Sequence, residues 1–212
     1  MLLLIDKPRG PTSHDVVTMV KRHLHADKAG HAGTLDPMAT GLLIIGINKE
    51  TRLLGDVVGQ DKEYRATLKL GTKTDTQDAD GRPIETGPVP DFTAEKISEI
   101  MRSLIGELEL QVPAYSAIRQ KGVPLYKLAR RGVVTQLPVR RTNIFTMTLE
   151  DWQSPQLTFS VKCSTGTYVR ALGEELAYRL GTVGHLAALR RIAVGSYHVN
   201  AATPLAALLL KR

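Results

Sequence analysis

Residues Gly30–Gly46 read GHAGTLDPMATGLLIIG, and the rest of the chain is organised around this stretch. The proline that follows Asp36 disfavours the helical conformation there, so this carboxylate is expected on an extended or turn segment. Gly33 and Gly41 allow backbone angles or close approaches that a side chain would forbid. Leu42–Ile45 is a short apolar run, typical of a strand that is buried on both faces. The pattern predicts a carboxylate on a tight loop before a buried strand, although an ordinary Asp-Pro turn leaves the same pattern.

Length, charge and cysteine content narrow the class of protein. The 212 residues suit one large domain, or one domain with an insertion, and the net charge of +7 favours a polyanionic partner. The single cysteine, Cys163, excludes a disulfide framework and any multi-cysteine zinc site, and its alternating surroundings predict a core residue. No apolar run approaches the roughly 18 residues that span a bilayer, and the opening residues are too short for a signal peptide. We therefore expect a cytoplasmic protein without membrane contact.

Periodicity and capping residues predict the helices and strands. Strands are expected at Leu2–Ile5, Leu42–Ile45, Lys62–Leu70, Glu107–Gln111, Pro138–Glu150 and Leu157–Cys163. Helices are expected from Thr12 or Ser13 to about His25, at Thr93–Leu104, at Leu125–Arg131, from the Ser164–Arg170 segment to just before Gly181, and from Thr203-Pro204 onward. The polar segment Gly71–Gly81 is expected to be a loop, and Leu24 is expected on the buried face of the first helix with Val16, Val17 and Val20.

Tyr64 lies in the alternating run Lys62–Leu70, on the same face as Ala66 and Leu68. The alternation therefore directs Tyr64 to the buried side of a strand. A core tyrosine and a tyrosine that faces a cleft both fit this position.

Residues 112–140 form a basic, loop-rich insertion that contains the short predicted helix Leu125–Arg131. Its positive charge comes from Arg119, Lys121, Lys127, Arg130 and Arg131, and its flat aromatic faces from Tyr115 and Tyr126. Such interleaving suits RNA because charge follows the backbone while rings stack on bases. A solvated amphipathic helix would have the same composition. Arg190 and Arg191, near the end of the chain, are also expected to face phosphate.

The stretch GHAGTLDPMATGLL resembles, nearly residue for residue, the signature of the TruB family of RNA pseudouridine synthases. Other segments resemble that family's motifs in the same order: LLLIDKPRGPTSHD, KEYR, TDTQDADG, YSAIRQKGVPLYKLAR, GTYVR and LAALRR. The resemblance runs from Leu2 to about Val199. It implies the pseudouridine synthase fold, an α+β domain with a mixed, mainly antiparallel sheet, flanking helices and a thumb-like insertion at 112–140. Residues 1–212 are then one catalytic domain, without the C-terminal PUA domain of many relatives.

The same resemblance assigns roles to individual residues. Asp36 is the catalytic nucleophile, Tyr64 stacks on the target base, and Arg170 completes the catalytic set. Contacts with RNA or the target base are implied for His31, Asp78, Tyr168 and Leu189 and for the basic residues of the insertion, and support of the active-site loop for Lys7 and Pro8. His31 is placed to fill the space that an extruded base leaves, although a hydrogen bond that braces the loop is an alternative role.

Pseudouridine forms when the glycosidic bond of uridine breaks, the uracil turns, and C5 joins C1′. No redox change occurs, so neither a cofactor nor a metal is expected. Asp36 must stay ionised in a dry pocket, and a nearby guanidinium typically lowers a carboxylate pKa by about 1–3 units. We therefore expect Arg170 to pair with Asp36. The residues leave open whether Asp36 attacks C1′, attacks C6, or removes a proton from C2′.

By resemblance, the substrate is the uridine at position 55 in the T-loop of tRNA, modified by a monomer that requires no protein partner. One alternative is a non-catalytic RNA-binding or tRNA-folding module, but the joint presence of Asp36, Tyr64 and Arg170 favours the enzyme. A second alternative is a glycosidase that uses Asp36. That chemistry usually needs a second carboxylate as acid, whereas the matching motifs supply tyrosine and arginine.

Overall fold

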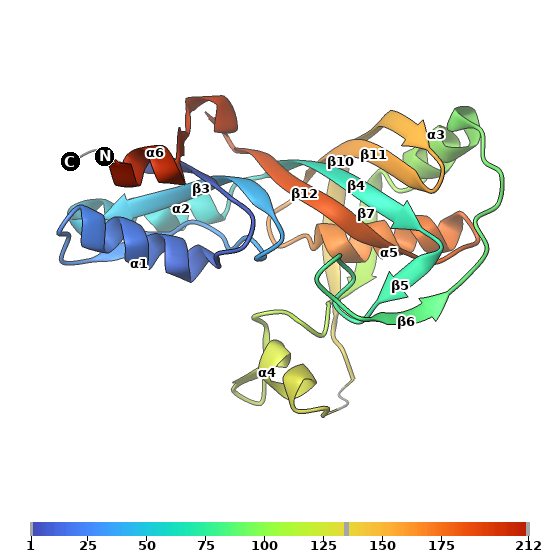
Figure 1. Ribbon diagram of the computed structural model, residues 1–212, viewed down its shortest axis with the longest axis horizontal. Helices are drawn as coiled ribbons and strands as arrows, with labels where there is room; N and C mark the ends of the chain where they lie inside the picture. Colours follow the sequence, from blue (N-terminus) through green and yellow to red (C-terminus); the bar gives the residue numbers. More distant parts are fainter. Residues whose placement is uncertain (1, 134–135, 211–212) are drawn as a thin grey trace. The chain divides into compact units, whose positions relative to one another are not determined.

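The computed structural model describes residues 2–133 and 136–210 and has an α+β fold in which helices flank mainly antiparallel strands (Figure 1). The strands are β1 Leu3–Lys7, β2 Ala29–His31, β3 Thr40–Ile47, β4 Lys62–Leu70, β5 Thr72–Thr74, β6 Pro83–Thr86, β7 Gly106–Gln111, β8 Arg119–Gln120, β9 Val123–Pro124, β10 Val139–Gln153, β11 Gln156–Cys163, β12 Gly184–Val194, β13 Tyr197–His198 and β14 Thr203–Pro204. The helices are α1 Ser13–His23, α2 Leu54–Val58, α3 Ala94–Arg102, α4 Leu125–Arg130, α5 Val169–Arg179 and α6 Leu205–Leu210, with 3-10 turns at Asn48–Leu53 and Val199–Ala201.

The chain divides into two compact units. The first contains the residues up to Arg65, Lys162–Thr165, and the residues from Leu189 onward, and the second contains Ala66–Val161 and Gly166–Ala188. Strands β4, β11 and β12 contribute residues to both units.

The first unit is built on β3, as the opening stretch predicts. Its strands follow the order β14-β1-β3-β12, and β2 pairs with β3. Leu42–Ile45 of β3 is wholly buried, which confirms the prediction of a strand covered on both faces. Helix α1 packs against β2 and β3. The pairing of β1 with β3 is antiparallel and that of β12 with β3 is parallel, so the sheet is mixed.

Helix α1 starts where its capping residues predict. The Thr12 hydroxyl accepts a hydrogen bond from the Asp15 amide at 3.1 Å, and the Asp15 carboxylate accepts one from the Thr12 amide at 2.9 Å. The helix buries Val16, Val17 and Val20. The expectation that Leu24 lies on this face is wrong, because the helix ends at His23 and Leu24, now the C-cap, is 42% exposed.

The second unit contains strands in the order β4-β11-β10-β7, with α3 and α5 packed against each other and against β10 and β7 respectively. The alternation of β4 is confirmed, since every second residue from Lys62 to Leu70 is buried. The helix expected at Thr93–Leu104 is confirmed as α3, which Thr93 caps and which buries Ile97 and Met101. The insertion between β7 and β10 holds the β8–β9 hairpin and α4, and residues 134–135 of it lie outside the described residues (Figure 1).

Two local predictions are wrong. The segment expected as a polar loop contains β5, which forms a hairpin with the exposed strand β6; neither strand shows the alternation that would predict it. The last helix starts at Leu205 instead of Thr203, because Thr203–Pro204 pairs in parallel with β1 as β14.

Candidate active site

Asp36 lies on the loop that joins β2 to β3, which we call the aspartate loop (residues 32–39). Its carbonyl oxygen accepts a hydrogen bond from the Ala39 amide at 3.1 Å, which closes a four-residue turn with Pro37 at the second position. The side chain is half-buried. The loop therefore contains an Asp-Pro turn, and this turn fixes the backbone that carries the Asp36 carboxylate.

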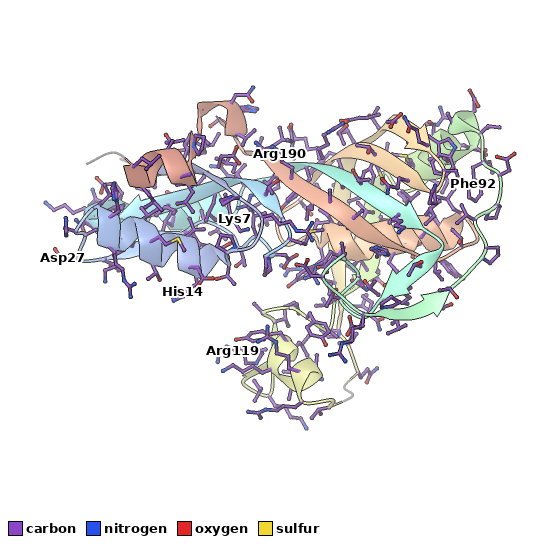
Figure 2. The ribbon with its side chains drawn as sticks, viewed as in Figure 1. Lys7, His14, Asp27, Phe92, Arg119 and Arg190 are labelled. Carbon is purple, nitrogen blue, oxygen red and sulfur yellow. The ribbon has the colours of Figure 1, made fainter. Side chains whose placement is uncertain are left out.

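Ser13, the first residue of α1, and Lys7 of β1 hold the backbone of the aspartate loop. The Ser13 hydroxyl accepts a hydrogen bond from the Leu35 amide at 2.8 Å and donates to the Leu35 carbonyl at 3.1 Å. The Lys7 ammonium, on β1, is fully buried and donates to the carbonyls of Ala39 at 2.7 Å, Pro8 at 3.0 Å and Pro37 at 3.3 Å (Figure 2). These contacts fix the backbone on both sides of the Asp36 turn.

Arg191, on β12, holds the same loop through its guanidinium. Only 1% of this residue is exposed. Its Nε donates to the Leu42 carbonyl at 2.7 Å, Nη2 to the Gly33 carbonyl at 3.1 Å, and Nη1 to the Thr34 carbonyl at 3.4 Å. The expectation that Arg191 faces phosphate is therefore wrong.

The neighbouring Arg190 is engaged by the carboxylate of Asp6, with nitrogen–oxygen distances of 2.7 and 3.0 Å. Its side chain is 39% exposed. The structure thus gives Arg190 a protein carboxylate as its partner, in a bidentate ion pair, where the sequence suggested a phosphate.

Tyr64 lies beside this network on the buried face of β4. Burial raises the pKa of the Tyr64 hydroxyl, and the nearby Cys163 and Asp36 raise it as well, whereas the charge of Arg191 and a hydrogen bond with it act in the opposite direction. The net shift is upward from 10.0, so this hydroxyl is neutral near pH 7. Tyr64 thus offers a protonated hydroxyl on the buried face of β4, and the charge of Asp36 acts on it.

His31 and Leu189 belong to the same unit. His31 ends β2, just before the aspartate loop, and burial lowers the pKa of its imidazole, with the charges of Arg191 and His14 acting in the same direction. The ring is therefore neutral near pH 7. Leu189 is buried on β12, two residues before Arg191, so both side chains lie on one face of that strand.

The second unit brings Arg170 and Asp78 together. Arg170 is 4% exposed near the start of α5, and its guanidinium donates to the Thr76 carbonyl at 2.8 Å and to the Tyr115 carbonyl at 3.0 Å. The Asp78 carboxylate lies 3.8 Å from it and accepts hydrogen bonds from the Thr76 hydroxyl at 2.6 Å and the Asp80 amide at 3.1 Å. Tyr168 is the N-cap of the same helix.

The basic residues of the insertion are all exposed. These are Arg119, Lys121, Lys127, Arg130 and Arg131, and Figure 2 labels Arg119 near α4. Arg130 lies over the Tyr126 ring at 5.5 Å from its centroid, which is a cation–π contact. The Arg119 guanidinium donates to the Gly122 carbonyl at 3.1 Å, at the turn of the β8–β9 hairpin. Most of this charge therefore faces solvent, where a polyanion can reach it.

Sequence reasoning missed the structural use of Arg191 and the burial of Lys62. The Lys62 ammonium donates to the carbonyls of Val58 and Gln60, each at 2.6 Å, and to the Thr165 hydroxyl at 2.9 Å. Burial lowers its pKa, and the charge of Arg191 lowers it further. Strand alternation could have predicted the burial of both residues, because Arg191 lies on the same face as Leu189 and Lys62 on the same face as Tyr64.

Within residues 2–133 and 136–210, no group of three or more histidine, cysteine, aspartate or glutamate side chains is arranged to hold a metal ion. The described helices include none that is long and apolar enough to cross a membrane.

Comparison with known proteins yields one family. The family model described as "TruB family pseudouridylate synthase (N terminal domain)" matches residues 21–169. The tRNA pseudouridine synthase B of Syntrophotalea carbinolica is 42% identical over 207 residues, which are 98% of this chain and 68% of the relative. The protein of the same name from Opitutus terrae is 45% identical over 207 residues, or 98% of this chain and 86% of the relative.

Solved structures agree on the fold. A chain in the crystal structure of a Cbf5-Nop10-Gar1 complex superposes with a TM-score of 0.77 at 27% identity, covering 98% of this chain and 53% of that chain. A chain in an H/ACA RNP bound to a substrate RNA containing 2'-deoxyuridine gives a TM-score of 0.75 at 26% identity, covering 98% and 52%. The chain thus spans about half the length of these two.

Proposed function

Because the chain belongs to the TruB family of pseudouridylate synthases, we propose that it converts the uridine at position 55, in the T-loop of tRNA, to pseudouridine. Identities of 42% and 45% over nearly the whole chain identify it as a tRNA pseudouridine synthase. The finer proposal is supported by one observation: Asp36 lies on a loop whose backbone is held by three buried side chains, in the same unit as the buried Tyr64. Such a carboxylate is preorganised for chemistry on a base that has left its stack.

The reaction is an isomerisation, and its atoms balance without a co-reactant. The C1′–N1 bond breaks, the uracil turns, the C1′–C5 bond forms, C5 loses its proton, and N1 gains one. Asp36 supplies the carboxylate that acts on the nucleotide, whether at C1′, at C6 or on the C2′ proton. Tyr64 supplies an aromatic face for the uracil and a hydroxyl that relays a proton, and Leu189 supplies an apolar wall.

Arg170 is proposed as the cation that keeps Asp36 ionised. The carbonyls of Thr76 and Tyr115 and the Asp78 carboxylate orient its guanidinium on a buried helix start. In the proposed role the Arg170 charge lowers the Asp36 pKa, which offsets the rise that a dry pocket causes. Asp78 then acts by orienting Arg170.

Binding of the T stem-loop is proposed to involve the insertion and His31. The exposed arginines and lysines of the insertion suit phosphates, and the neutral His31 ring can take the stacking place of the extruded uridine. We further propose that residues 1–212 act as one catalytic domain, as a monomer that needs no protein partner, in the cytoplasm where tRNA is available.

The test is tritium release from a T stem-loop RNA that carries tritium only at C5 of the target uridine. The wild type and Asp27→Asn, an exposed aspartate of the same unit, are expected to release tritium, whereas Asp36→Asn is not. Release by Asp36→Asn would show that Asp36 is not the catalytic carboxylate. No release by the wild type, with tight RNA binding retained, would replace the enzyme by an RNA-binding module. Release only from RNA labelled at another uridine would overturn the T-loop assignment.

A further inference from the structure

The aspartate loop is held from two sides by cations that are buried beneath it. Lys7 approaches from β1 and contacts the carbonyls at the end of the loop. Arg191 approaches from β12 and contacts the carbonyls at its start. Burying a charge is costly unless its hydrogen bonds are satisfied, and here main-chain carbonyls satisfy them. The family motifs explain why Lys7 lies there, but they give Arg191 no role.

Arg191 joins the two ends of the loop through one rigid group. The Gly33 and Thr34 carbonyls precede Asp36 by three and two residues, and the Leu42 carbonyl lies in β3, beyond the loop. The planar guanidinium presents its donors in a fixed fork, so three carbonyls on one group set the separation between loop entry and loop exit. A lysine, with a single nitrogen on a flexible stem, cannot reproduce that fork.

The base of the Arg191 side chain is fixed as well. Arg191 pairs in register with Gly41 of β3, and the two backbones touch so closely that a Cβ on Gly41 would lie 2.3 Å from the Arg191 carbonyl oxygen. Only glycine at position 41 permits this approach, and its φ of +99° is one that glycine adopts freely. The Arg191 guanidinium therefore extends from a strand that lies directly against β3, the strand that follows the aspartate loop.

We propose that Arg191 is a positioning residue for catalysis: it sets the place of Asp36 by spanning the aspartate loop. This inference rests on the proposed function, because the rate that it affects is that of pseudouridine formation. Arg191 acts through its neighbours and is not expected to touch the RNA, since it is almost fully buried.

The test separates chemistry from binding and from folding. Single-turnover rates and RNA dissociation constants are measured on the T stem-loop RNA for Arg191→Lys, Arg191→Gln and the matched control Arg190→Gln. Arg190, which Figure 2 labels, directly precedes Arg191 on β12 and pairs with Asp6. Its substitution therefore controls for the loss of an arginine from this strand. Circular dichroism and thermal melting establish the folded fraction, to which each rate is normalised.

Arg191→Gln is expected to slow the single-turnover rate about a hundredfold, because displacement of a reacting group by about 1 Å costs that much. Arg191→Lys is expected to slow it at least about tenfold, with RNA affinity within about threefold of wild type for both. Arg190→Gln is expected to stay within about threefold in rate. If Arg191→Gln does not fold, the rate of Arg191→Lys decides the test, because lysine keeps the positive charge but lacks the planar guanidinium.

Two results would overturn the inference. A rate within threefold of wild type for a folded Arg191→Lys would show that the planar guanidinium fork does not matter. A loss of rate in Arg190→Gln equal to that in Arg191→Gln would show a general effect on β12. A wild type without activity would instead be a failure of the proposed function, so the two failures are distinct.

Discussion

Substitution of Gly41 by alanine tests whether β3 and β12 are packed as tightly as the structure shows. A Cβ at this position would lie 2.3 Å from the carbonyl oxygen and 2.8 Å from the amide nitrogen of Arg191. Both atoms belong to the backbone of a paired strand and cannot rotate away as the end of a side chain can. The φ of +99° adds a conformational cost of its own.

The expected loss of stability has two parts. The positive φ costs a residue with a side chain about 1–2 kcal/mol. Separating the two strands to an ordinary contact distance is overpacking, which costs about 1–3 kcal/mol. Together they lower the free energy of unfolding by about 2–5 kcal/mol, which for a chain of this size lowers the melting temperature by roughly 4–20 °C.

Two other glycines of the same unit provide matched controls. Gly10 has a φ of +110° but open space around its Cβ position, so Gly10→Ala is expected to show the conformational cost alone. Gly55 lies in α2 without a positive φ and also has open space, so Gly55→Ala is expected to be neutral or to stabilise by up to about 1 kcal/mol. The three variants separate backbone strain from steric overlap.

Urea denaturation followed by circular dichroism measures the series. Gly41→Ala is expected to be the least stable of the three variants, with a free energy of unfolding at least about 1 kcal/mol lower than that of Gly10→Ala. Equal stability of these two variants would refute this expectation, because the approach of Gly41 to Arg191 would then impose no constraint. The single-turnover rate of folded Gly41→Ala is also expected to fall, since the fork of Arg191 would be displaced from the loop carbonyls.

Two further predictions concern titratable groups of the first unit, Lys62 and His31. Lys62→Met is expected to lower the free energy of unfolding by about 1–3 kcal/mol, because the Gln60 carbonyl loses its ammonium donor. Urea denaturation measures this loss. A variant as stable as wild type would mean that the lost hydrogen bond is offset because a charge is no longer buried. Burial lowers the pKa of His31 below its ordinary value of 6.5, so between the lowered pKa and 6.5 the unfolded chain binds more protons than the folded chain. The contribution of His31 to the free energy of unfolding is therefore complete above pH 6.5 and is lost as the pH falls. The stability of wild type relative to His31→Gln is therefore expected to drop between pH 7.5 and pH 5.5, and a difference that is equal at both pH values, or larger at pH 5.5, would contradict this.

Local patterns predicted those parts of the fold that local forces determine. Leu42–Ile45 could be assigned because four consecutive apolar residues after a glycine suit a fully covered strand. The start of α1 could be assigned because the Thr12–Asp15 capping box needs only neighbouring residues. The β5–β6 hairpin was missed because its strands are polar and short, and only pairing with each other makes them strands.

The candidate site was predicted in its residue types but not in its supporting contacts. Asp36 and Tyr64 could be singled out from motif and alternation, and the structure places both in the first unit. The burial of Lys7, Lys62 and Arg191 could not be read from composition, because lysine and arginine are normally solvated. Each of these cations is buried because a loop or helix end presents carbonyls that need donors.

Arg190 and Arg191 show why neighbouring identical residues can have opposite uses. On a strand, successive side chains point to opposite faces, so only one of two adjacent arginines can reach the core side. The face of Leu189 takes Arg191 to the aspartate loop, whereas Arg190 points to the other face and meets Asp6. A pattern of basic residues alone treats both as candidates for phosphate, but strand alternation separates them once Leu189 is known to be buried. A cation buried under an active-site loop can therefore affect the reaction by holding the loop backbone in place, as well as a charged residue that lines the site.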